Sequence, residues 1–130
     1  MATPPRPTTG HPPRPTLFGL GQPAQAGAHY REALGAYVEH DDRWSLALLL
    51  EDVVLLALHI ERAAQALQLV GAADALREQL AAPRAPAPAK ALDSALAGAR
   101  QAADAGRHLA DGAALDQAGV VALVAEVCGT

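Results

Sequence analysis

The chain has 130 residues, enough for one domain with one core, and its formal net charge is −4 at pH 7. A negative chain is poorly suited to neutralise phosphates, which argues against direct nucleic-acid binding. Thirty-two residues are alanine, leucine is the next commonest apolar type, and only four residues are aromatic. Because Ala and Leu favour helices and strand-favouring residues are few, the composition predicts an all-α protein.

The N-terminal 22 residues are predicted to be a disordered tail. The stretch "MATPPRPTTGHPPRPTLFGLGQ" is rich in proline and glycine, which disfavour regular structure. "PPRP" occurs twice, and a plain linker is favoured over a polyproline-binding motif. No continuous apolar core of a secretion signal is present, and the single cysteine, Cys128, makes no internal disulfide. Both observations favour a cytoplasmic location.

The rest of the chain, residues 23–130, is predicted to form one domain of about five helices. Pro23 suits a first helical turn, and Asp41 or Asp42 can cap the second helix. Asp116 is a good cap for the last helix, and the Pro/Ala-rich residues 82–89 are predicted to be a stiff connector. The expected helices are residues 23–39, 44–60, 63–80, about 90–105 (or to 110), and 116 to just before Gly129.

The most apolar segment is "WSLALLLEDVVLLALHI", Trp44 to Ile60. A membrane span is unfavourable here, because the segment is short for a bilayer and two acids lie at its centre. Ser45, Asp52 and His59 recur every seven residues as one polar stripe, and the remaining circumference is apolar. A helix apolar on nearly all sides is normally buried, so this helix is predicted to lie at the centre of the domain.

A weak internal repeat supports helical hairpins. Ala26, Tyr30 and Ala33 are matched forty residues later by Ala66, Val70 and Ala73. Such small-large-small spacing lets two helices pack closely. No helix breaker is present from Ala36 to Val70, so the second and third helices are either continuous or joined by a tight turn.

Three stretches carry a family resemblance: "YREALGAYVEHDDRWSLALLLEDVVLLAL", "GAADALREQLAAPRAPAPAKALDSALAGAR" and "DGAALDQAGVVALVAEV". Over residues 24–128 the chain resembles the C-terminal tetratricopeptide-type region of large actinobacterial transcriptional regulators, the ATPase-containing LuxR-type and SARP/AfsR-like proteins. The resemblance implies an array of antiparallel helical hairpins. It departs from the family at "IERA", where a Gly-Asp turn is usual, and neither a phosphate-binding loop nor a basic helix-turn-helix is present.

The repeat pattern of that family implies two sets of positions. Seven positions are expected to pack internally: Leu50, Val53, Val54, Ala57, Ala66, Val70 and Ala73. Five are expected to face a concave, partner-binding groove: Leu48, Glu51, Leu55, Leu58 and His59. Because a short array leaves apolar surface where earlier repeats would stack, a second partner or homodimer surface is expected on the first helix, at Tyr30, Leu34 and Tyr37.

Reactive constellations are sparse. No His pair has HExxH spacing and no Cys pair exists, so neither a metal nor a cofactor is predicted. Asp104 and His108 are one helical turn apart and are interpreted as a solvated pair. Trp44 is interpreted as a core plug rather than an interface anchor.

Three functional hypotheses follow. The favoured one is a non-enzymatic helical protein-interaction module, either a fragment of a regulator or a stand-alone adaptor. The alternative is a self-associating helical bundle that binds a small apolar ligand. An enzyme is disfavoured because no acid-base or nucleophile constellation stands out.

Overall fold

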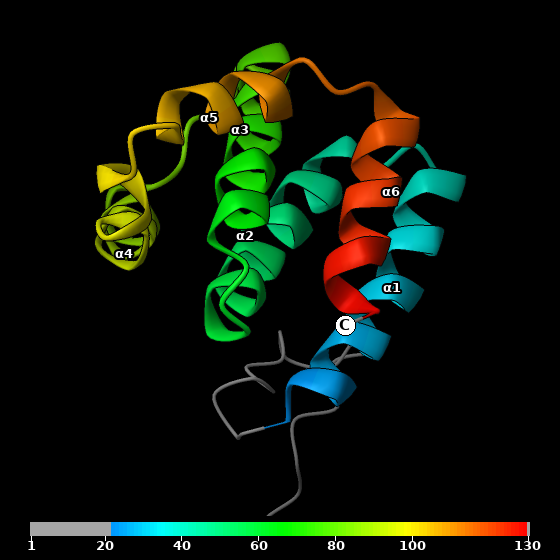
Figure 1. The fold of residues 1–130 in the computed structure, drawn as a ribbon. Coiled ribbons are helices and arrows are strands. Elements are labelled where there is room, and N and C mark those ends of the chain that lie inside the picture. The colour runs from blue at the N-terminus through cyan, green and yellow to red at the C-terminus, as the bar shows by residue number, and fades with distance from the viewer. Residues whose placement is uncertain (1–21, 130) are drawn as a thin grey trace, which may run out of the picture.

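The computed structural model describes residues 22–129, and within that range every regular element is a helix (Figure 1). The all-α prediction is therefore confirmed. The predicted disordered tail, apart from Gln22, and the terminal Thr130 lie outside the described residues. The elements are α1 Pro23–Glu39, α2 Arg43–His59, α3 Ala63–Leu80, α4 Pro86–Leu96, the short 3-10 helix η2 Ala99–Gln101, α5 Ala105–Ala113 and α6 Gln117–Cys128.

The first three helices end in the same way, at a twenty-residue interval. Asp41, Glu61 and Ala81 have positive φ angles of 50°, 62° and 52°. At the second of these turns the Arg62 N–H donates to the Ala57 carbonyl at 2.7 Å, closing a Schellman-type cap. The α2 and α3 helices are therefore separate, although no glycine marks the break.

Helix α2 lies at the centre of the domain, as its sequence predicted. It contacts α1, α3, α4 and α6. Eight of its residues are buried, and the Asp42 side chain accepts a hydrogen bond from the Ser45 N–H at 3.1 Å to cap its start. The seven positions expected to pack internally are all buried, and six of them, all except Leu50, are completely so. Their internal packing is confirmed.

The last helix folds back over the first two helices. In Figure 1, α6 runs antiparallel beside α1. A Cβ atom on Gly27 would lie 2.5 Å from the Cys128 carbonyl oxygen, so only glycine permits this approach. Asp116 caps α6 as predicted, because its side chain accepts from the Gly119 N–H at 2.8 Å. The helix also contacts α2 and α3, which closes the hydrophobic core.

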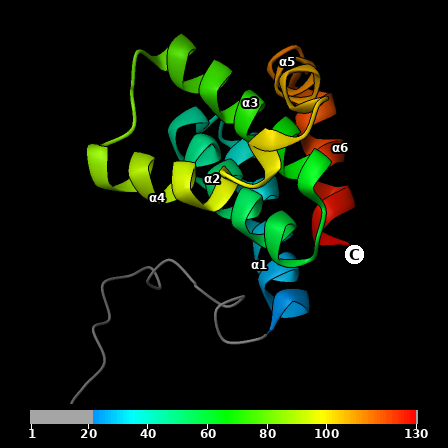
Figure 2. The ribbon, with the colours of Figure 1, turned by 60° about the vertical axis from the view of Figure 1, so that its left-hand side comes forward.

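The region after α3 differs from expectation. The chain was predicted to form a connector over residues 82–89 and one helix from Lys90 onward, but α4 already begins at Pro86 and ends at Leu96. Proline lacks an N–H that the first helical turn would leave unpaired, so Pro86 starts the helix without loss. A separate helix, α5, follows η2 and packs on α3, while α4 lies across α2 (Figure 2).

Among the described residues, no helix combines the length and apolar character needed to cross a bilayer.

Candidate functional site

The five groove positions predicted on α2 do lie on the less buried side of that helix. Leu48, Leu55 and Leu58 are half-buried and His59 is exposed. Together with Glu51, the three leucines are spaced three or four residues apart, which aligns them along one face of the helix. Glu51 belongs to the same face, but its carboxylate is only 12% exposed because it is held by arginines of this chain. Glu51 is therefore better described as an internal ion-pair partner than as a free contact for a partner protein.

Trp44 extends this face toward the start of α2 and is not the core plug that was predicted. Its side chain is 49% exposed. The Arg77 guanidinium carbon lies 5.3 Å from the ring centroid, which is within cation–π range. A large aromatic side chain thus lies on the surface while its position is held by a cation from α3. We define the α2 face as Trp44, Leu48, Glu51, Leu55 and Leu58.

Two arginines converge on Glu51 near the middle of this face. Arg77, from α3, donates from Nε and from Nη2, the latter at 3.1 Å, to the two carboxylate oxygens. Arg84, from the linker before α4, donates from Nε to the same carboxylate at 2.8 Å. The side chains of Arg77 and Arg84 are only 7% and 15% exposed. Bidentate, largely buried pairs of this kind are stronger and better ordered than surface ion pairs.

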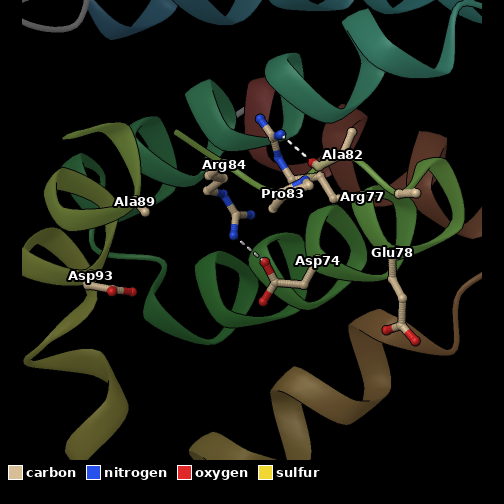
Figure 3. Close-up of a pocket in the computed structure, with 9 residues that line it drawn as sticks. Asp74, Arg77, Glu78, Ala82, Pro83, Arg84, Ala89 and Asp93 are labelled. Atoms are coloured by element: carbon tan, nitrogen blue, oxygen red, sulfur yellow. Dashed lines mark hydrogen bonds and ion pairs between the residues drawn. The ribbon is translucent and has the colours of Figure 1, made fainter. Parts of the chain in front are cut away.

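The same arginines also bind the linker and α3. Arg77 Nη1 donates to the Ala82 carbonyl at 2.8 Å, and Arg84 Nη1 donates to the Asp74 carboxylate (Figure 3). Two positive and two negative side chains therefore balance within one cluster. We call Glu51, Asp74, Arg77 and Arg84 the arginine cluster. It joins α2, α3 and the linker that leads into α4.

An open groove of about 650 Å³ borders the arginine cluster. It lies between the C-terminal half of α3, the linker, and α4, with the cluster residues Asp74, Arg77 and Arg84 on one side and Asp93 across from them (Figure 3). Its walls are mainly charged or consist of alanine and proline. The residues that line it are Asp74, Arg77, Glu78, Ala81, Ala82, Pro83, Arg84, Ala89 and Asp93.

The second predicted surface, on the first helix, is largely absent. Tyr30 is 1% exposed and Leu34 is 5% exposed, and both belong to the hydrophobic core. Tyr37 is half-buried against that core. Helix α6 packs on α1 as well as on α2, and it covers the side of α1 where preceding repeats would have stacked. Tyr30 and Leu34 are therefore core residues and not contacts for a partner.

Two further reactive groups of the described residues are the Asp104–His108 pair and Cys128. His108 Nε2 lies 3.0 Å from the Asp104 carboxylate, with Asp104 largely exposed and His108 only 15% exposed. The pair is thus less solvated on the histidine side than predicted. No group of three potential metal ligands occurs in residues 22–129. Burial raises the pKa of the Cys128 thiol to about 11, so this group stays protonated and poorly nucleophilic near neutral pH.

Sequence reasoning did not predict the arginine cluster, although one signal was present. The packing positions Ala66, Val70 and Ala73 continue, at the same helical spacing, to residue 77, which is an arginine. An arginine on a buried stripe needs a carboxylate partner. Glu51, which the repeat pattern assigned to the groove, is one of the two acids at the centre of the second helix and is the partner that the structure gives to this arginine.

Comparison of the chain with models of known protein families, with curated proteins and with solved structures gave no match.

Proposed function

We propose that the protein is a non-enzymatic helical module that binds another protein through the α2 face. The observation that carries the proposal is the exposed Trp44 at the end of a row of half-buried leucines, Leu48, Leu55 and Leu58. A surface of one aromatic residue followed by aliphatic residues at helical spacing suits the apolar face of a partner helix.

The chemistry of this face matches that of binding hot spots. Tryptophan and arginine are the residue types most enriched among contacts that dominate binding energy. Trp44 is held in place by Arg77, and Arg77 is in turn fixed by Glu51 and by the Ala82 carbonyl. An aromatic side chain that is already ordered loses little conformational entropy on binding, which favours affinity.

The alternative of a bundle that binds a small apolar ligand has less support. Two hollows, of about 250 and 390 Å³, lie next to α5, and both are partly open at the surface. Sites for small apolar ligands usually enclose most of the ligand surface in an apolar cleft or cavity, which hollows open at the surface do not provide. The proposed role in transcriptional regulation, as an adaptor or as part of a regulator, rests on the resemblance alone, and a cytoplasmic location rests on the use of a single cysteine.

The proposal is tested with the two exposed large apolar side chains of the described region, Trp44 and Leu115. Tagged wild-type protein, Trp44→Ala and Leu115→Ala are purified from cells that make the protein, and associated proteins are quantified. We expect a partner whose recovery falls at least about tenfold with Trp44→Ala, a typical hot-spot effect, and is unchanged with Leu115→Ala. Equal recovery with both variants would show that the α2 face does not bind the partner.

A further inference from the structure

We propose that residues 81–96, the linker and α4, form a strap that occupies the α2 face in place of a partner helix and can open while the rest of the domain stays folded. When closed, the strap blocks the α2 face from a partner, and this part of the inference rests on the proposed function. Its opening is a property of this chain alone and is measured without a partner.

The attachment of α4 to the domain is narrow. The helix lies against α2 (Figure 2). Among its residues only Leu92 and Leu96 are buried. These two leucines are one helical turn apart and both belong to the hydrophobic core. By contrast, α2 has eight buried residues and so does α3. Segments with few buried apolar contacts are those that open locally before global unfolding.

A groove, not a packed interface, separates α4 from its other neighbour. The open volume of about 650 Å³ lies between α3 and α4, and Ala89 and Asp93 of α4 line it. Figure 3 shows these two side chains on the α4 side of the groove and Asp74 and Glu78 on the α3 side. Helix α4 itself therefore packs mainly on α2, and the polar contacts of the strap with α3 come from the linker.

The arginine cluster holds the first part of the strap. Arg84, a strap residue, donates to Glu51 of α2 and to Asp74 of α3. The Ala82 carbonyl, also in the strap, accepts from Arg77. Arg84 thus binds Glu51 directly, and Ala82 binds Arg77, which itself pairs with Glu51. Glu51 is a member of the α2 face. When these bonds break, the strap loses its polar attachment and Arg77 loses one of the partners that hold it beside Trp44.

The strap also indicates the kind of partner that fits. An amphipathic helix with two leucine-like residues at positions i and i+4 reproduces the way in which Leu92 and Leu96 contact the domain. An acidic residue that replaces the strap's carbonyl group could accept from Arg77. The partner is therefore expected to be a protein helix that competes with α4 for α2.

Hydrogen exchange of the full chain tests the opening. In the wild-type protein we expect backbone amides of residues 90–96 to exchange at least about tenfold faster than those of buried α2 residues. Arg84→Ala should raise exchange in α4 a further tenfold or so, since a charge-assisted bond is lost, while α2 and α3 change little. Arg107→Ala, which removes an arginine from an exposed ion pair on α5, is the matched control and should leave α4 unchanged.

The single tryptophan provides a second readout. Arg84→Ala should shift the fluorescence of Trp44, because the Arg77 contact beside it is loosened, and Arg107→Ala should not. If amides of α4 exchange as slowly as those of α2, the proposed opening of the strap is wrong, because α4 would then open only when the whole domain unfolds. An Arg84→Ala variant with wild-type α4 exchange would equally overturn the role of the arginine cluster.

Binding of a peptide tests whether α4 occupies the place of a partner helix. A synthetic peptide of residues 81–96 is titrated against the wild-type protein and against Leu92→Asp, which removes one of the strap's anchors. We expect binding at least tenfold tighter to Leu92→Asp, with Lys90→Ala, on the exposed side of α4, as the control that behaves like wild type. If the peptide does not bind Leu92→Asp although α4 exchanges fast in that variant, α4 does not occupy the place of a partner helix. The Trp44 purification experiment judges the proposed function separately.

Discussion

At the scale of single residues, Glu51 shows how a charge is accommodated in an apolar helix. Its carboxylate receives three hydrogen bonds from two arginines, so it is paired on both oxygens. Removing one partner of a buried pair leaves a charge without compensation, which is more costly than losing a surface pair. The resemblance to tetratricopeptide-type repeats implied a groove contact at this position, whereas the structure uses it to join three segments.

Cys128 allows a prediction about pH. Burial raises its pKa from 9.0 in the unfolded chain to about 11 in the folded protein. Below pH 9 the Cys128 thiol is neutral in both the folded and the unfolded state, so its ionisation does not reduce the stability of the fold. As the pH rises from 9 to 11 the unfolded state ionises first, and stability is lost. Urea unfolding of wild type and Cys128→Ala between pH 7 and 11 should show the wild type losing more stability above pH 9. A constant difference between the two proteins would contradict the assignment.

At the scale of elements, three successive helices end in left-handed residues, none of which is glycine. Asp41, Glu61 and Ala81 lie twenty residues apart, and each is followed by a hydrogen bond to a carbonyl of the preceding helix. L-residues are unfavourable in this region because Cβ approaches the following carbonyl. Tight packing between neighbouring helices, such as α2 with α3, compensates for this local strain.

The strain can be measured at Glu61, whose side chain is exposed. Glu61→Gly should stabilise the protein by about 0.5–1 kcal/mol, because glycine adopts positive φ without steric penalty. Ala36→Gly, at an exposed position inside α1, is the control and should destabilise by about 1 kcal/mol. Both changes in the free energy of unfolding are measured by chemical denaturation. Destabilisation by both substitutions would mean that the turn at Glu61 carries no strain.

At the scale of the whole molecule, the later helices cover surfaces that the first three helices leave open. Helix α6 covers α1, and α5 packs on α3 at a very short distance. A Cβ atom on Gly112 would lie 1.9 Å from the Gln68 carbonyl oxygen, and one on Gly71 would lie 2.2 Å from the Leu109 carbonyl oxygen. The two helices therefore meet backbone to backbone, which requires glycine on both sides of the contact.

Gly112→Ala should therefore destabilise the protein by at least about 2 kcal/mol, since a helix backbone must move to admit the methyl group. Gly106 lies in the same helix with nothing within 4 Å of a Cβ position. Gly106→Ala should stabilise by up to about 1 kcal/mol through higher helix propensity. Thermal or urea unfolding of the two variants gives the comparison. Equal effects of the two substitutions would show that α5 does not pack closely on α3.

The sequence by itself determined the helical class, the bounds of the first three helices to within one residue, the cap at Asp116, and the central place of α2. These features follow from local propensity and from the periodicity of apolar residues, which act over a few turns of chain. The early start of α4 at Pro86 was missed because Pro/Ala-rich sequence suits both a stiff connector and a first helical turn.

Only the tertiary structure decided which surfaces remain free. The burial of Tyr30 and Leu34 depends on α6, about ninety residues further along the chain. The cation that lies against the exposed Trp44 ring comes from Arg77 of α3. The pairing of Glu51 likewise needs Arg77 and Arg84 to approach from two other segments. Such contacts join residues far apart in sequence, and their geometry follows from how whole helices pack, which no local pattern specifies.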